Sequence, residues 1–268
     1  MASSFAPQDV AAFEHATWSR CAPGYARGFG TLTGEAVPAL LEAVPVGSDM
    51  RVLDIGTGTG AVAAAAHSMG AKVVGIDFSD AMLAEARRRL PDIEFRSAPA
   101  EALPFADTSF DAVLANAVLH HLGDPARALG EASRVLAPNG RIACTVWAEP
   151  EKLEAFGLFF AAVEEHAGGA DLPHGPLFGV TDRKTVEPLL ACNGFEDIEF
   201  ETLDIAWRMK SIDTLLQALG TWAQLESFPE ATRHAIEADV RTAAVRYTNS
   251  DGLSIPNPML LISGTRSG

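Results

Sequence analysis

Short apolar runs alternate with amphipathic segments over residues 51–147. The apolar runs lie at residues 51–55, 71–77, 93–98, 110–118 and 141–147. Runs of this length that end at turn residues are typical of strands buried on both faces. Helical spacing indicates intervening helices at residues 61–69, 82–90 and 125–136. Because repeated strand–helix–strand units build a parallel sheet with helices on both faces, the pattern predicts an α/β fold.

Beyond Trp147 this rhythm changes. Helices are predicted at residues 152–167, 185–194, 211–226 and 230–246, and strands at 195–207 and 258–266. The last strand is expected to be antiparallel, because only helices lying off the sheet are predicted just before it. No stretch has the composition of a linker. We therefore expect one domain over residues 1–268, divided into an N-terminal cover of two or three short helices (1–47), a cofactor-binding core (48–148) and lid segments (149–182 and 209–250).

A glycine-rich turn follows the first apolar run. The sequence Val52-Leu53-Asp54-Ile55-Gly56-Thr57-Gly58-Thr59-Gly60 ends that strand and opens the next helix. Glycine lets the chain turn sharply and lets a ligand press against bare backbone, and a helix N-terminus presents free N–H groups. Asp77 ends the second run, where a carboxylate can accept hydrogen bonds from two ribose hydroxyls. The turn and Asp77 together indicate a nucleoside cofactor.

Two kinds of cofactor fit this loop. Gly56, Gly58 and Ala61 satisfy the G-x-G-x-x-G/A fingerprint of NAD-binding proteins. However, Asp54 stands two residues before the first glycine and Gly60 adds a third, and this D-x-G-x-G-x-G pattern resembles motif I of class I methyltransferases. A dinucleotide brings a pyrophosphate to the helix N-terminus, whereas S-adenosylmethionine brings a sulfonium and an ammonium group. An acid that organises the loop favours the second ligand.

Further motifs resemble the ubiquinone/menaquinone-biosynthesis-type family of these methyltransferases. Residues 100–105 (AEALPF) and 109–111 (SFD) resemble its DAExLPF…SFD segment, residues 118–122 (VLHHL) its lHHl motif, and residues 134–141 (RVLAPNGR) its RVLkPGG turn. The motifs occur in the family's order within residues 51–147. The resemblance implies a Rossmann-like, seven-stranded, mostly parallel sheet with an antiparallel last strand, helices on both faces, and N-terminal and inserted helices that form a lid.

The resemblance also implies which residues contact S-adenosylmethionine and its product, S-adenosylhomocysteine. The glycine loop would hold the amino-acid part and ribose, Asp77 the ribose hydroxyls, and Phe78 and Met82 the adenine. The less favoured alternative is that Phe78 and Met82 are core residues. Pro99 replaces the family's aspartate, so adenine recognition would use the backbone of Ala100. The expected cofactor contacts are Tyr25, Asp54, Gly56, Thr57, Gly58, Gly60, Asp77, Phe78, Met82, Pro99, Ala100, Glu101, Asn116 and His121.

His120 and His121 are the candidate catalytic residues. A histidine beside the methyl donor could take a proton from an attacking hydroxyl or amine near neutral pH. Alternatively, one ring packs inside while the other caps a helix, and alignment alone suffices for an anionic or neutral amine nucleophile.

Aromatic residues outside the motifs suggest a substrate pocket. Trp147 should face the crevice at the carboxyl ends of the strands, with Trp18, Phe160 and Trp222 as further walls, although such residues are more often core.

Composition excludes several functions. The formal net charge of −15 argues against binding nucleic acid or an anionic membrane surface. Three widely separated cysteines show no metal-ligand spacing, so we expect no metal. The N-terminus lacks a signal-peptide pattern and no run is long enough to span a membrane, so we expect a cytoplasmic protein. A monomer or a homodimer is expected, although the oligomeric state does not follow from the sequence.

The sequence therefore predicts a methyltransferase that uses S-adenosylmethionine to methylate an O, N or C atom of a small molecule by in-line displacement. The alternatives are a protein of the same fold that binds this cofactor for non-methylating chemistry and, more remotely, an NAD-dependent oxidoreductase.

Overall fold

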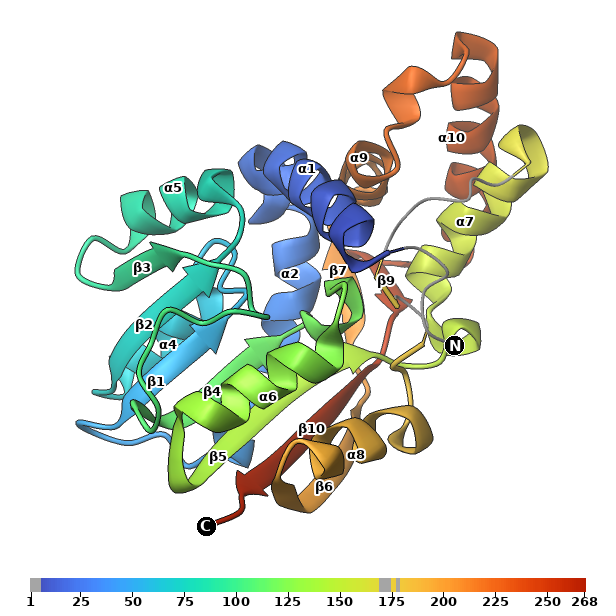
Figure 1. Cartoon of the computed structure of the whole chain (residues 1–268). Coiled ribbons are helices and arrows are strands. Elements are labelled where there is room, and N and C mark those ends of the chain that lie inside the picture. The colour runs from blue at the N-terminus through green and yellow to red at the C-terminus, as the bar shows by residue number, and fades with distance from the viewer. Residues whose placement is uncertain (1–5, 169–174, 177–178) are drawn as a thin grey trace.

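The computed structural model describes residues 6–168, 175–176 and 179–268, and its central element is a seven-stranded sheet with the order β3-β2-β1-β4-β5-β10-β6 (Figure 1). Its strands are β1 (Arg51–Ile55), β2 (Lys72–Asp77), β3 (Glu94–Ser97), β4 (Phe110–Asn116), β5 (Leu136–Trp147), β6 (Phe195–Leu203) and β10 (Met259–Arg266). β10 runs antiparallel to both of its neighbours, whereas the pairs among β3, β2, β1, β4 and β5 are parallel. The predicted fold and the antiparallel last strand are confirmed.

Helices cover both faces of this sheet. The α-helices of the described residues are α1 (Pro7–Tyr25), α2 (Phe29–Thr33), α3 (Val37–Ala43), α4 (Ala61–Ser68), α5 (Asp80–Arg89), α6 (Pro125–Val135), α7 (Glu154–Ala167), α8 (Arg183–Cys192), α9 (Asp213–Trp222) and α10 (Glu230–Ala244). Of these, α3, α4 and α5 pack on one face of the sheet, and α6 and α8 pack on the other. Along β1, Val52 packs into a core with α3, α4 and α5, whereas Leu53 packs into a second core with α6 and α8. This alternation explains why the strand is apolar throughout.

The prediction of one strand over residues 195–207 was wrong. β6 ends at Leu203, opposite Met259, where its partner β10 begins. The chain then turns, and β7 (Ala206–Met209) joins a separate sheet with β9 (Gly252–Pro256) and β8 (Thr248–Asn249), in the order β7-β9-β8. The β8–β9 hairpin was missed, so the segment before β10 does not consist only of helices.

The N-terminal segment begins with a longer helix than expected. α1 extends over 19 residues and lies across the carboxyl-terminal end of the sheet, where it packs against α5 and α9 (Figure 1). The helices α7, α9 and α10 of the inserted segments lie at the same end of the molecule. Part of the predicted lid at 149–182 falls outside the described residues. Within the described part of the chain, we find no helix with the length and apolar character needed to cross a membrane.

Candidate functional site

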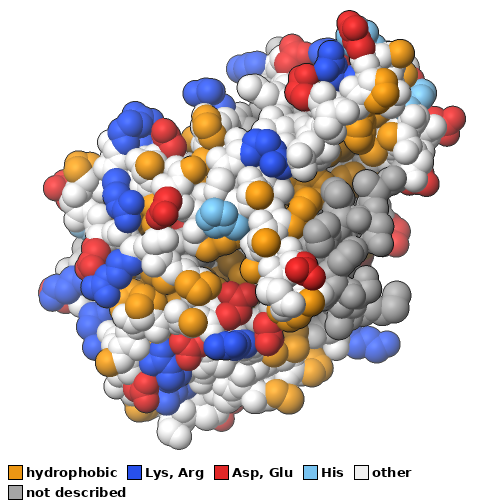
Figure 2. All heavy atoms as spheres, turned by 45° about the horizontal axis from the view of Figure 1, so that its top comes forward, with side chains coloured by type: hydrophobic (Ala, Val, Ile, Leu, Met, Phe, Trp, Pro, Cys, Tyr) orange, Lys and Arg blue, Asp and Glu red, His pale blue; other side chains and the backbone are white. Residues whose placement is uncertain are grey.

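A cavity opens at the carboxyl ends of β1, β2 and β4, beneath α1. Open α/β sheets bind ligands at this edge, where neighbouring connections leave on opposite faces. The empty space of the cavity, together with the open solvent at its mouth, is about 1170 Å³. Figure 2 shows hydrophobic side chains at the floor of a hollow on this face. Of the residues predicted for the site, those on the cavity wall are Trp18, Tyr25, Gly56, Gly58, Asp77, Phe78, Met82, Pro99, Ala100, Glu101, Asn116, His121, Trp147, Phe160 and Trp222.

The loop between β1 and α4 has a conformation that requires glycine. Gly56 and Gly60 have φ angles of 64° and 87°, in the left-handed region that side chains disfavour. A Cβ atom at Gly56 would also overlap the side chain of Val118, and one at Gly60 would come within 2.6 Å of Leu90. The loop therefore presents bare backbone to the cavity.

Three N–H groups of this loop are already committed to protein acceptors. Thr57 N donates to the Ile76 carbonyl (2.8 Å), Gly60 N to the Thr57 carbonyl (2.8 Å) and Gly58 N to Asp77 Oδ2 (2.9 Å). A pyrophosphate group would need such N–H groups as donors. The loop geometry therefore disfavours the dinucleotide alternative.

Asp54 shapes the loop from below and does not line the cavity. It is 1% exposed, and its Oδ2 accepts hydrogen bonds from Thr57 Oγ1 (2.6 Å) and Ala63 N (3.0 Å). Burial raises the pKa of Asp54 to about 7. Of the predicted cofactor contacts, Asp54, Thr57 and Gly60 do not line the cavity, and their direct contact with the cofactor stays a prediction.

Replacing Asp54 with asparagine should flatten the pH dependence of stability. The Asp54 carboxyl ionises near 3.8 in the unfolded chain and near 7 when folded, so its contribution to stability is lost as pH rises through that range. Because one pKa unit corresponds to about 1.4 kcal/mol, the wild type should lose on the order of 2 kcal/mol more than Asp54→Asn between about pH 5 and about pH 7.5.

Urea unfolding at the two pH values measures this difference. Buried His120, whose pKa is lowered by burial, contributes the opposite trend, but it is present in both proteins and cancels. The exposed Asp92→Asn variant is the matched control and should keep the wild-type slope. Equal slopes for the wild type and Asp54→Asn would contradict the prediction.

Asp77 connects the end of β2 to the glycine loop. Its Oδ2 accepts the Gly58 N–H and its Oδ1 accepts the Ser79 N–H, each at 2.9 Å. Burial raises the pKa of Asp77 to about 6, although the two backbone hydrogen bonds oppose the shift. A carboxylate has about four lone-pair sites, so Asp77 keeps acceptor capacity toward the cavity that it lines.

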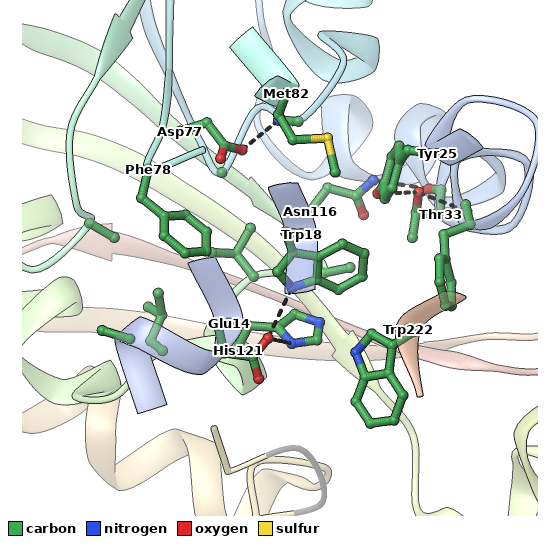
Figure 3. Close-up of a pocket in the computed structure, with 18 of the residues that line it drawn as sticks. Glu14, Trp18, Tyr25, Thr33, Asp77, Phe78, Met82, Asn116, His121 and Trp222 are labelled. Atoms are coloured by element: carbon green, nitrogen blue, oxygen red, sulfur yellow. Dashed lines mark hydrogen bonds and ion pairs between the residues drawn. The ribbon is translucent and has the colours of Figure 1, made fainter. Parts of the chain in front are cut away.

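Asn116 closes the wall at the end of β4. Its amide nitrogen donates to the Thr33 carbonyl (2.9 Å), and its oxygen accepts from Thr145 Oγ1 (2.6 Å). Tyr25 and Thr33 share a hydroxyl–hydroxyl hydrogen bond of 3.2 Å on the same side (Figure 3). Burial raises the pKa of Tyr25 to about 12, so this phenol is neutral at ordinary pH.

Apolar side chains from the segment after β2 form the next part of the cavity wall. Phe78 faces the cavity, with Met82 on the first turns of α5 beside it (Figure 3). Ser79 caps that helix by accepting the Met82 N–H (3.4 Å), which fixes where the two side chains lie. Ala100 is buried, whereas Pro99 is exposed at the rim.

Aromatic rings from α1, β5, α7 and α9 form the remaining wall. Trp18 lies between the Phe78 and Tyr25 sides of the cavity (Figure 3). Trp147 contacts Phe156 edge-on, with ring centroids 4.9 Å apart, and Phe160 contacts Trp222 at 5.9 Å. Among the described residues that line the cavity, none is lysine or arginine.

The two neighbouring histidines have different environments. His121 lines the cavity and packs edge-on against Trp18, with centroids 4.9 Å apart. His120 is fully buried behind it and contacts Trp147 at 5.5 Å. Burial lowers the pKa of His120 well below its ordinary value, which keeps it neutral. The prediction that His120 is catalytic gains no support from this position, because its ring is buried and does not line the cavity.

Glu14 is a member of the site that the sequence prediction missed. Its carboxylate lies 3.1 Å from His121 Nδ1 and accepts a hydrogen bond from Trp18 Nε1 (3.0 Å) (Figure 3). Glu14 lies four residues before Trp18, so the two side chains share one face of α1. Because Trp18 was predicted to line the pocket, this spacing could have identified Glu14 as a neighbour in the site. The described residues contain no cluster of three or more His, Cys, Asp or Glu side chains suited to hold a metal ion.

The fold and the site define a Rossmann-like nucleoside-cofactor protein, and the comparisons with known proteins identify its family. Residues 53–144 match the family model described as "Methyltransferase domain". The demethylmenaquinone methyltransferase of Clavibacter sepedonicus is 35% identical over 167 residues, which cover 57% of this chain and 68% of that protein. The chain belongs to the ubiquinone/menaquinone-type family of class I S-adenosylmethionine-dependent methyltransferases.

Other relatives align over a smaller part of their length. The demethylmenaquinone methyltransferase of Renibacterium salmoninarum is 39% identical over 127 residues, or 47% of this chain, and the chain spans only 52% of that relative. The aligned region thus supports the cofactor-binding core more directly than the rest of the molecule.

Solved structures show the same fold at low sequence identity. The YcgJ protein from Bacillus subtilis has a TM-score of 0.62 at 21% identity, covering 87% of this chain and 99% of that one. The [4+2]-cyclase SpnF has a TM-score of 0.57 at 22% identity, covering 88% and 81%. Because the second is named for another reaction, this likeness leaves the reaction to be argued from the site.

Proposed function

We propose that this protein uses S-adenosylmethionine to methylate an O, N or C atom of a small, largely apolar molecule. One observation carries the proposal: a single cavity brings the glycine loop and Asp77 together with His121 and an aromatic wall. The cofactor half of the cavity, at the glycine loop and Asp77, suits a nucleoside. The acceptor half, at His121 and the aromatic wall, suits an uncharged acceptor beside a ring that can accept a proton.

The donor groups around the loop fit S-adenosylmethionine. Asp77 has free acceptor capacity for ribose hydroxyls, Phe78 and Met82 offer apolar faces to adenine, and bare backbone at Gly56 and Gly58 admits the amino-acid part. The cationic ends of this cofactor meet a wall that bears Glu14, Asp77 and Glu101 but, among the described lining residues, no cationic side chain. When bound, it supplies an electrophilic methyl group and leaves as S-adenosylhomocysteine.

The acceptor half of the cavity favours a neutral ring. Aromatic side chains bind planar apolar molecules well, and the described wall offers no cation to pair with a phosphate or carboxylate. The relatives are named for demethylmenaquinone, and a molecule of that class would suit this wall.

His121 is the group best placed to take a proton from the acceptor. Of the other ionisable groups on the wall, Tyr25 is neutral with a pKa near 12, Asp77 holds the loop and Glu14 is already paired. Glu101 follows Pro99 and Ala100, on the side proposed for adenine. Transfer of the proton to His121 would leave the electron pair on the acceptor atom that is to be methylated.

Calorimetric titration and methyl-transfer assays test this proposal. S-adenosylmethionine and S-adenosylhomocysteine should bind, and NAD should not; no binding of the first two would overturn the proposal. Transfer of labelled methyl groups to a quinol related to demethylmenaquinone, or to another member of a panel of phenols and amines, would distinguish methylation from the non-methylating alternative.

The affinity for S-adenosylhomocysteine should depend on pH through Asp77. The ionised carboxylate is the form that accepts hydroxyl donors, and its pKa is about 6. Below that pH the proton must leave before the ligand binds, so Kd should rise by about tenfold for each pH unit. Calorimetry should show a plateau above about pH 7 and proton release at about pH 5.5. A pH-independent Kd across this range would contradict the role of Asp77.

A further inference from the structure

Glu14 is a buried carboxylate in an otherwise aromatic part of the wall. It is 1% exposed and accepts two hydrogen bonds, from Trp18 Nε1 (3.0 Å) at Oε2 and from the Gly175 N–H (3.1 Å) at Oε1. His121 Nδ1 lies 3.1 Å from Oε2. Removing a carboxylate from water costs several kcal/mol unless its partners compensate. An apolar residue would hold α1 against the core at lower cost, so the charge itself calls for an explanation.

The contact with His121 determines which ring nitrogen is free. A carboxylate oxygen 3.1 Å from Nδ1 repels a lone pair on that nitrogen, and it therefore favours the tautomer that carries its proton on Nδ1. That tautomer leaves the lone pair of Nε2 available to accept a proton. Triads and dyads in hydrolases use the same arrangement, in which an acid orients a histidine that acts as the base.

The charge of Glu14 also stabilises the protonated ring. When Nε2 gains a proton, the imidazolium lies next to an ionised carboxylate in a poorly solvated site, where opposite charges interact strongly. His120 is the other titratable group against this ring, with centroids 4.3 Å apart. Since burial lowers the pKa of His120, it stays neutral and adds no competing positive charge.

We propose that Glu14 is the positioning residue of a Glu14–His121 pair that holds His121 ready to accept the acceptor's proton. In this step the O–H or N–H bond of the acceptor breaks, the proton moves to Nε2, and the electron pair stays on the acceptor for the new bond to the methyl group. Glu14 remains ionised throughout. The inference rests on the proposed methyl transfer.

The pair joins two separate parts of the chain. Glu14 lies on α1, whereas His121 ends the short 3₁₀ helix Leu119–His121 that follows β4. The base is therefore oriented only while α1 covers the cavity.

Nuclear magnetic resonance of the imidazole nitrogens tests the pair without an acceptor. In the wild type, with and without S-adenosylhomocysteine, His121 should carry its neutral-state proton on Nδ1, and a His121→Asn variant assigns the signals. In Glu14→Gln the ratio of the two tautomers should shift toward Nε2–H by about tenfold, or about 1.4 kcal/mol, because the carboxylate charge next to Nδ1 is lost.

The controls separate this role from simple attachment of α1. Asp9→Asn removes an exposed carboxylate from the same helix and should leave the tautomer unchanged. An unchanged tautomer in folded Glu14→Gln would overturn the proposal. A neutral His121 that carries its proton on Nε2 in the wild type would also overturn the proposal. This second test does not depend on whether the variant folds. Calorimetry with wild-type protein and S-adenosylhomocysteine tests the underlying function separately, since it reports cofactor binding whatever the tautomer.

Discussion

Replacing Asp77 with asparagine should weaken the binding of S-adenosylhomocysteine on the order of 100-fold. The carboxylate accepts the Gly58 and Ser79 N–H groups through different oxygens. Asparagine supplies one oxygen and an NH₂ group, so one buried N–H would face a donor, at a cost of about 1–3 kcal/mol. Hydrogen bonds to the ribose would weaken as well, and about 2.7 kcal/mol in total corresponds to 100-fold.

Calorimetry on folded protein measures this loss. Asp80→Asn is the matched control, because it removes an exposed carboxylate from the first turn of α5, three residues along the chain, and its Kd should stay within about threefold of the wild type. Asp77→Asn should also lose the dependence of Kd on pH below about 6. Wild-type affinity in Asp77→Asn would exclude Asp77 from the cofactor site.

The parallel part of the fold could be predicted because its signal is local. Each strand of the β3-β2-β1-β4-β5 region is an apolar run bounded by turn residues, and both faces are buried, so the pattern is strong. The break between β6 and β7 could not be predicted this way. The break lies where β10 begins at Met259, opposite Leu203. Pairing between segments that are distant in the sequence does not show in the local pattern of hydrophobic residues.

The two halves of the candidate site also differ in how well the sequence predicts them. The cofactor half depends on the loop that contains Gly56 and Gly58 and on Asp77, which lie at fixed positions after two strands. The acceptor half is assembled from α1, α7 and α9, whose positions follow from tertiary packing. Glu14 meets His121 only because α1 folds across the end of the sheet.

The sequence also did not determine which of the two neighbouring histidines faces the cavity. His120 and His121 are adjacent and chemically identical, yet one is fully buried and the other lines the cavity. The 3₁₀ turn of residues Leu119–His121 sends them in different directions. This difference predicts that the two histidines will respond differently to replacement.

Replacing His121 with asparagine should lower kcat by about 100-fold to 10,000-fold while cofactor affinity changes little. Positioned general bases contribute factors of this size, and asparagine keeps a polar side chain of similar reach without a titratable ring. The cofactor contacts proposed for the glycine loop and Asp77 do not involve this ring, so Kd for S-adenosylhomocysteine should stay within about threefold. Single-turnover transfer of labelled methyl to an accepted phenol or quinol gives the rate of the step itself.

A substrate that needs no base gives the sharpest form of this prediction. For an acceptor that is already anionic at the assay pH, His121→Asn should transfer methyl nearly as fast as the wild type, because no proton remains to be removed. His67→Gln, which replaces an exposed histidine on α4, should behave as wild type with both kinds of acceptor. An equal loss of rate with protonated and anionic acceptors would mean that His121 shapes the pocket and does not act as the base.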